Sequence, residues 1–204
     1  MRQLIDFFCT PYAHATAFQI TLEIVAVFFG IVSVLYAKKE NIRVFPTGIV
    51  STVLYVYICY QFTLYGDMVI NLYYTLMSFY GWYVWNHKPL GQSIEITTSN
   101  SLDMLKAFGI FISTVAFVVG VYLYYDRFDR VTDYFDTFTS GIFFAGMWLM
   151  AHKKIEHWMF WILGNLISIP LYFVKGLGFS GLQFTIFLIL AVQGYIEWKK
   201  HLNK

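Results

Sequence analysis

Polar and aromatic side chains recur on one face of an otherwise apolar segment. Trp161, Asn165, Ser168 and Tyr172 follow one another at intervals of four, three and four residues. In a helix this spacing places all of them on one side. An amide and a hydroxyl inside a membrane-spanning helix need hydrogen-bond partners, because unpaired polar groups in hydrocarbon are costly. The indole and the phenol add flat surfaces for stacking. This face therefore predicts a site for a small, flat, polar molecule.

Two further sets of polar residues fall at helical spacing. Asn71, Thr75 and Ser78 form a second stripe, and Gln183 and Gln193 lie within about 80° of each other on a helical wheel. Amides, hydroxyls and aromatic rings suit a neutral or cationic heteroaromatic ligand with a sugar-like part, and not a bare ion. The candidate substrate-binding residues are Gln61, Asn71, Tyr80, Trp82, Asp136, Trp148, Trp161, Asn165, Ser168, Tyr172, Gln183 and Gln193.

A purely structural role is the alternative interpretation for several polar and aromatic residues. A serine or threonine in a membrane helix often bonds to its own backbone. Trp85, Trp158 and Trp198 fall at the ends of apolar segments, where tryptophan commonly anchors a helix at the membrane interface. His152 and His157 loosely match a metal-site spacing, but they lie in a basic loop, so we expect no metal there. The sequence has no Gly-x-Ser-x-Gly motif and no phosphate-cradling loop, so neither an enzyme nor a cofactor is expected.

The composition is that of an integral membrane protein. Hydrophobic residues make up 58% of the chain, aromatic residues 21% and charged residues 13%. A soluble domain carries roughly 25% charged residues, so this chain has too few to cover a water-exposed surface. The lipid bilayer is therefore the expected environment. The net charge of +2 gives no indication of nucleic-acid binding.

Seven segments approach the length of about 20 apolar residues that a membrane-spanning helix needs. Lys and Arg are unequally divided between the loops on the two sides, with ten on the side of the C-terminus and four on the side of the N-terminus. The more basic side is expected to be cytoplasmic, which places the N-terminus outside the cell. The predicted spans are Phe18–Ala37, Val44–Phe62, Met68–Trp85, Leu105–Tyr125, Phe135–Ala151, Trp158–Val174 and Gly181–Trp198.

The chain also contains an internal repeat. Glu40–Trp85 aligns with Lys153–Trp198 at a constant offset of 113 residues, so that Gly81 meets Gly194. The alternative is that two apolar stretches align by chance. A repeat predicts two three-helix halves, residues 18–88 and 134–200, joined by a linker with the fourth helix, residues 89–133. An odd linker gives both halves the same orientation, as in transporters built from parallel repeats.

Two groups of motifs extend this interpretation. The first comprises Gln61-x-x-Leu-Tyr, Asn71 and Tyr80-Gly-Trp-Tyr-x-Trp. The second is Lys153-Lys-Ile-Glu-x-Trp-x-x-Trp-x-x-x-Asn165-x-Ile-Ser. Together they resemble the PnuC family of vitamin transporters over nearly the full chain. The resemblance implies an all-α, SWEET-like 3+1+3 fold in a bacterial inner membrane and a homotrimer with one pathway in each protomer.

The resemblance also implies a substrate and a mode of transport. The usual substrate is nicotinamide riboside, which enters by facilitated diffusion and is trapped by a separate cytoplasmic kinase. Trp161 would stack on the base and Asn165 would bond a polar edge, while Gln61 and Tyr80 match family positions on the facing half. Position 71 is Asn where the family pattern has Gln, position 193 is Gln where it has Asn, and Phe rather than Trp precedes Asp136.

These departures leave three hypotheses. The first is a nicotinamide riboside transporter, and the second is a thiamine or other vitamin transporter on the same scaffold. The third, from a different class, is a membrane sensor that transports nothing. Glu23 and Asp136 lie within apolar segments, so coupling to an ion stays open.

Overall fold

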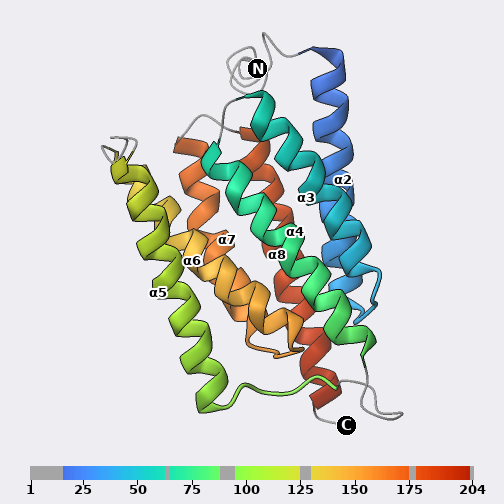
Figure 1. Ribbon diagram of the computed structural model, residues 1–204. Coiled ribbons are helices and arrows are strands. Elements are labelled where there is room, and N and C mark those ends of the chain that lie inside the picture. The colour runs from blue at the N-terminus through green and yellow to red at the C-terminus, as the bar shows by residue number, and fades with distance from the viewer. Residues whose placement is uncertain (1–15, 63–64, 88–94, 125–129, 175–177, 203–204) are drawn as a thin grey trace.

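The computed structural model describes residues 16–62, 65–87, 95–124, 130–174 and 178–202, and these fold into seven α-helices (Figure 1). The predicted all-α fold is confirmed, and each predicted span coincides with one helix. Five of the helices (α2, α3, α5, α7 and α8) are long and apolar enough to cross a membrane. The helices are α2 (Ala17–Lys38), α3 (Val44–Gln61), α4 (Tyr65–Asn86), α5 (Ser101–Tyr124), α6 (Val131–Ala151), α7 (His157–Val174) and α8 (Gly178–Leu202).

Helix α6 is more polar than these five and more enclosed. Its buried residues include Asp133, Thr137, Thr139 and Ser140. The hydroxyls of Thr137, Thr139 and Ser140 donate to carbonyl oxygens one turn earlier in the same helix. Because the helix pairs its own hydroxyls in this way, it can lie inside the protein without leaving them unsatisfied.

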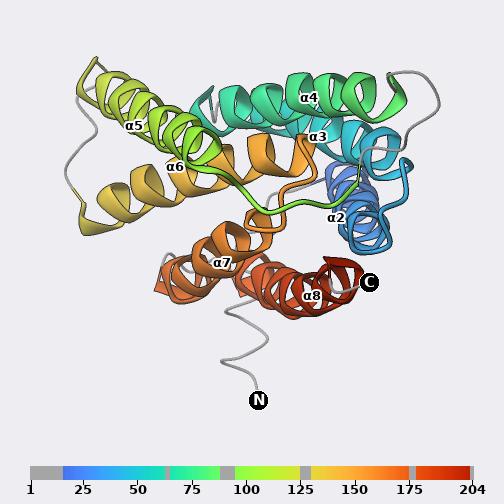
Figure 2. The same cartoon turned by 90° about the horizontal axis from the view of Figure 1, so that it is seen from below.

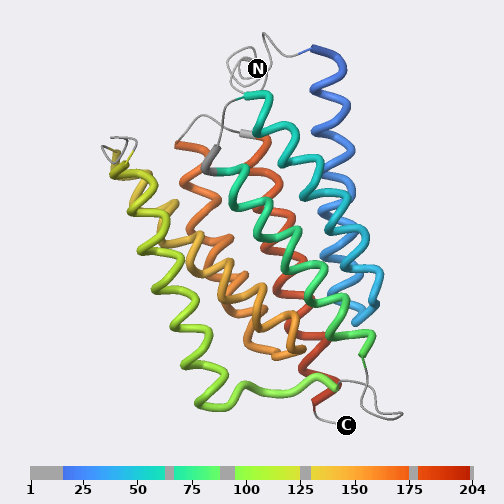
Figure 3. The backbone as a smooth tube through the Cα atoms, viewed as in Figure 1, coloured from blue at the N-terminus to red at the C-terminus, as the bar shows by residue number. Residues whose placement is uncertain are grey.

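The helices pack as two sets of three with one helix outside them. Helices α2, α3 and α4 pack in chain order, as do α6, α7 and α8, and α5 packs on α6. The two sets meet where α2 contacts α8 and where α4 contacts α6. Figure 2 shows α2, α3, α6, α7 and α8 around a common centre. The trace in Figure 3 shows the described helices running alternately up and down, from a first helix that starts at one end to a last helix that finishes at the other.

The α2–α3 and α6–α7 turns have the same backbone structure. Glu40 and Lys153, which are 113 positions apart, have φ angles of 51° and 52°. Three hydrogen bonds of the first turn, Lys39 N to Tyr36 O, Glu40 N to Ala37 O and Asn41 N to Tyr36 O, recur in the second turn at the same offset. The carboxylate of Glu40 and the ammonium of Lys153 also pair at 3.2 Å. The two turns therefore lie at the same end of the bundle, which we call the basic end.

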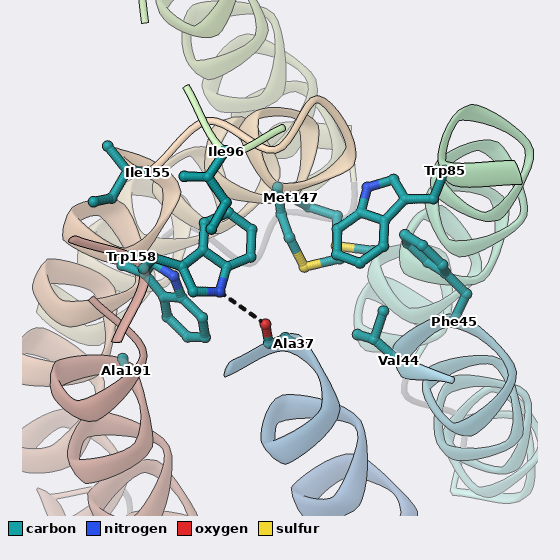
Figure 4. Close-up of a cluster of buried hydrophobic side chains, with 11 residues drawn as sticks. Ala37, Val44, Phe45, Trp85, Ile96, Met147, Ile155, Trp158 and Ala191 are labelled. Carbon is teal, nitrogen blue, oxygen red and sulfur yellow. Dashed lines mark hydrogen bonds between the residues drawn. The ribbon is translucent and has the colours of Figure 1, made fainter. Parts of the chain in front are cut away.

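A cluster of buried apolar side chains closes the basic end (Figure 4). Figure 4 shows Trp85 and Phe45 on one side of it and Trp158 on the other, with Met147 between them. The exposed fractions of Trp85, Trp158 and Trp198 are 6%, 0% and 0%. Our expectation that these tryptophans are interfacial anchors is therefore wrong. They are buried because they fill the junction of the two halves.

Two of these tryptophans join the halves by reciprocal hydrogen bonds. The indole Nε1 of Trp85 in α4 donates to the carbonyl of Ala151 in α6 at 3.2 Å. The indole Nε1 of Trp198 in α8 donates to the carbonyl of Ala37 in α2 at 3.0 Å. Each carbonyl lies in the last turn of its helix, beyond the regular helical hydrogen bonds, and that of Ala37 also accepts from the backbone N of Glu40 in the following turn. The last helix of each half thus caps the first helix of the other.

Candidate functional site

The polar face of α7 is buried inside the bundle. Asn165 is 3% exposed and Ser168 is 1% exposed. Neither side chain makes a hydrogen bond to any residue that the structure describes. An amide and a hydroxyl without protein partners inside a bundle are available to pair with a ligand or water. Asn165 and Ser168 therefore form the centre of the candidate site.

Trp161 lies one turn toward the basic end from Asn165. A Cβ built on Gly146 of α6 would lie 2.8 Å from Cδ1 of its indole, so the ring packs closely against a position without a side chain. The ring also meets Trp158 edge-on, with the centroids 5.4 Å apart. Trp161 therefore sits on top of the apolar cluster and forms the floor of the candidate site.

The facing half fills the equivalent space differently. At the offset of 113, Trp161 corresponds to Gly48 and Gly146 corresponds to Ser33. A Cβ built on Gly48 would lie 3.0 Å from the hydroxyl of Ser33. Large side chains thus line α7 where small ones line α3. The site is asymmetric, although the turns and the helix order of the two halves match.

Tyrosines from both halves lie beyond Asn165, toward the end opposite the basic one. The hydroxyl of Tyr55 in α3 donates to the side-chain oxygen of Gln183 in α8 at 3.3 Å. Tyr172 packs against Phe184, with the centroids 4.8 Å apart. Tyr172 also lies within electrostatic range of Tyr55. The structure thus brings the predicted residues Tyr172 and Gln183 to the junction of α3 with α7 and α8.

Two carboxylates add negative charge above these tyrosines. Asp67 at the start of α4 and Asp136 near the start of α6 both interact electrostatically with Tyr172. The side chains that we place in the site itself are neutral indole, amide, hydroxyl and phenol groups. A cation entering from this end would be attracted by the carboxylates, and a phosphate would be repelled.

The predicted residues of the N-terminal half make other contacts. Gln61 is exposed at the end of α3 and donates to the hydroxyl of Tyr57 at 2.7 Å. The amide of Asn71 donates to the carbonyl of Asp67 in its own helix at 2.8 Å. Tyr80 is 41% exposed. Its hydroxyl lies 3.1 Å from Nε2 of His152, at the basic end. The structure does not gather these three residues around Asn165.

Three other candidates also lie apart from the α7 face. Gln193 is exposed and accepts a hydrogen bond from Lys38 at 2.8 Å. Trp82 packs against the apolar cluster of the basic end. Trp148 lies on the α5 side of α6, where Nζ of Lys106 is 6.0 Å from the centre of its ring. These contacts give the three side chains structural surroundings of their own.

The expected stripe on α4 is a helix–helix contact. Thr75 is buried and donates to the hydroxyl of Thr52 in α3 at 2.7 Å. Ser78 is buried as well, and its hydroxyl would lie 3.5 Å from a Cβ on Gly48. Small residues with hydroxyls commonly allow membrane helices to pack closely. Thr75 and Ser78 therefore hold α4 against α3.

The sequence analysis missed the aromatic contact between the halves. Tyr73 of α4 stacks on Phe144 of α6, with centroids 3.6 Å apart and planes 7° apart. Its hydroxyl donates to the carbonyl of Phe144 at 3.2 Å. Tyr74, which is adjacent, meets Phe144 edge-on at 5.6 Å and lies within electrostatic range of Tyr172. The two adjacent tyrosines inside an apolar segment were the feature of the sequence that indicated this contact.

Comparison with known proteins gives matches whose names all describe transporters. The family described as "Nicotinamide mononucleotide transporter" matches residues 20–200. The chain is 30% identical over 187 residues to the nicotinamide riboside transporter PnuC of Neisseria mucosa, covering 86% of this chain and 71% of the relative. It is 20% identical to PnuC of Escherichia coli, covering 87% and 84%. It is 27% identical over 127 residues to the riboflavin/roseoflavin transporter RibM of Streptomyces davaonensis, covering 60% and 58%.

The fold is also that of a solved structure. A crystal structure described as the vitamin B3 transporter PnuC superimposes with a TM-score of 0.71 at 23% sequence identity. The match covers 99% of this chain and 89% of the other. At this identity the likeness concerns the fold, and it extends over all seven helices.

Proposed function

This chain belongs to the nicotinamide mononucleotide transporter family, which includes PnuC, and we propose that it is a membrane transporter for nicotinamide riboside. The observation that carries the proposal is Asn165, a residue that is 3% exposed inside the bundle and whose side chain makes no hydrogen bond to the described residues. The carboxamide of nicotinamide offers both a donor and an acceptor to such a group. Trp161 beside it offers a face on which a pyridine ring can stack.

Charge separates the riboside from the mononucleotide named in the family description. A phosphate calls for Arg, Lys or several backbone donors, and the side chains assigned to the site are neutral. The charges within electrostatic range of its tyrosines are the carboxylates of Asp67, Asp136 and Glu23. They favour the positively charged pyridinium of nicotinamide riboside and disfavour the additional phosphate. The same charges favour this substrate over riboflavin, whose ring system is neutral.

Thiamine is the second candidate, because its thiazolium ring is also cationic and its pyrimidine is flat. The asymmetric filling of the two halves supports a ligand held mainly by α7, with tyrosines from the other half above it. That arrangement suits either vitamin. The choice between them depends on the groups that Asn165 and Ser168 meet.

We further propose that the halves, residues 18–88 and 134–200, rock about this site while the linker that contains the fourth helix, residues 89–133, keeps them parallel. The matching turns and the reciprocal tryptophan bonds support this division. The described conformation is closed at the basic end by the apolar cluster. With the basic end cytoplasmic, this state would receive substrate from outside, and facilitated diffusion with trapping by a separate kinase would drive net uptake. A homotrimer in the bacterial inner membrane belongs to the same proposal.

Counterflow into liposomes that contain only this protein tests the proposal. Vesicles loaded with unlabelled nicotinamide riboside should accumulate the labelled compound, and vesicles loaded with nicotinamide mononucleotide should not. Counterflow of thiamine without that of nicotinamide riboside would assign the chain to thiamine. Absence of both would leave a membrane sensor as the better reading. Uptake that requires a proton or sodium gradient would contradict facilitated diffusion.

A further inference from the structure

A groove on the outside of the bundle has no residue of α7 among those that line it. It has a volume of about 610 Å³ and runs between α4, α5 and α6. It extends along α5 from Lys106 to Phe117, with Tyr73 and Trp148 opposite. Lys106, Gly109, Ser113 and Phe117 are exposed, so the groove opens outward.

The groove exists because α5 packs on α6 and small residues occupy the adjacent face of α5. A Cβ built on Gly109 would have no heavy atom within 4 Å. On the opposite wall, Tyr73 is fixed by stacking on Phe144 and by the hydrogen bond from its hydroxyl. The walls are thus held in place by the protein itself, and the space between them is available to another molecule.

The length of the groove matches one leaflet of a bilayer. Eleven residues separate its ends on α5, which is about 16 Å at ~1.5 Å per residue. The hydrocarbon core of a membrane is about 30 Å thick, so one leaflet is about 15 Å deep. A hydrocarbon chain from that leaflet can therefore follow the groove for its whole depth.

A free positive charge lies at the end of the groove near the basic end. Lys106 makes no ion pair with the residues that the structure describes, and its nearest aromatic ring is Trp148, at 6.0 Å. The neighbouring carboxylate of Asp103 pairs with Lys154 at 2.9 Å and lies within electrostatic range of Lys106 as well. A lysine near a helix end extends its ammonium toward the membrane surface, where lipid headgroups lie.

We propose that this groove binds an anionic phospholipid, with one acyl chain between α4 and α5 and the phosphate at Lys106. The lipid holds α5 beside α4 on the two sides of the groove. Trp148 contacts the lipid at its headgroup end. This site does not depend on which solute the protein carries. Lipid binding would also account for the position of Trp148 away from Asn165.

Quenching of tryptophan fluorescence tests the proposal on the full-length protein in neutral detergent. The probes are phosphatidylglycerol and phosphatidylcholine with brominated acyl chains, and the signal of Trp148 is obtained by difference from Trp148→Phe. Brominated phosphatidylglycerol should quench Trp148 at about five-fold lower concentration than brominated phosphatidylcholine, the preference expected for one basic group at an anionic lipid. Lys106→Gln should remove this preference.

Lys199→Gln is the matched control, because Lys199 is also exposed near the basic end and its Nζ lies 5.7 Å from the ring of Tyr195. It should leave the preference unchanged. Gly109→Leu fills the groove from an open position and should reduce quenching by both lipids. Equal quenching by the two lipids in the wild type would overturn the proposal, as would an equal effect of Lys199→Gln. Disulfide formation between Ser113→Cys copies in membranes would show that a second chain covers the groove and would also overturn it.

Discussion

Replacing Asn165 by Leu separates a binding role from a structural one. Asn165 is 3% exposed and its side chain makes no hydrogen bond to the described residues, so removing the amide breaks no hydrogen bond with them. Asn165→Leu should therefore leave the thermal stability unchanged or raise it. If the amide pairs with the carboxamide of the substrate, its loss leaves a buried polar group of the ligand unpaired, at a cost of about 1–3 kcal/mol. The dissociation constant should then rise about 5- to 150-fold.

Both quantities can be measured on one purified sample. Binding of labelled nicotinamide riboside to detergent-solubilised protein gives the affinity, and thermal unfolding followed by tryptophan fluorescence gives the stability. Thr137→Val is the matched control, because Thr137 is 4% exposed and its hydroxyl donates to the carbonyl of Asp133 in its own helix at 2.7 Å. It should lower stability by up to ~1 kcal/mol and leave the affinity unchanged.

The opposite pattern would refute the reasoning. An Asn165→Leu protein that binds substrate with unchanged affinity but unfolds at a lower temperature would show that the amide has a structural partner. Tighter binding would show that the amide opposes the ligand. Either result would remove Asn165 from the centre of the site.

Three further predictions concern packing and orientation. Trp198→Phe removes a buried interhelical hydrogen bond and should lower the free energy of unfolding by ~1–2 kcal/mol, seen as a lower melting temperature. Gly194→Ala places a methyl group 2.5 Å from a buried indole and should destabilise by ~1–3 kcal/mol, whereas Gly120→Ala, with no atom within 4 Å, should be neutral or slightly stabilising. With the basic end cytoplasmic, a cysteine from Lys199→Cys should react with an impermeant maleimide only in opened cells, and one from Thr16→Cys should react in intact cells; the reverse would invert the proposed topology.

The order of the helices could be predicted from the sequence because it follows from composition. Apolar segments of membrane-spanning length are conspicuous in a chain with so few charges. The offset of 113 was likewise detectable, because Gly81 and Gly194 are each needed where an aromatic ring presses on the backbone. Those rings belong to Phe45 and Trp158, which the same offset relates.

The rotation of each helix could not be predicted in the same way. In a membrane, the lipid-facing and protein-facing sides of a helix are both apolar, so the apolar residues do not show which side faces the protein. Gln193 and Trp148 consequently looked as suitable for a site as Asn165 did. Their surroundings are set by long-range partners, Lys38 for Gln193 and Lys106 for Trp148, which no local pattern indicates.

The reciprocal tryptophan bonds have a consequence for biosynthesis. The carbonyl of Ala37 accepts a hydrogen bond from Trp198, which is 161 residues later in the chain. At about 5–20 residues per second, synthesis of that interval takes roughly 10–30 s. During this time the first half is already made, and the last turn of α2 lacks the hydrogen bond from Trp198. Each half is thus completed only by the other, so two separately translated halves should be able to assemble with one another in the same membrane.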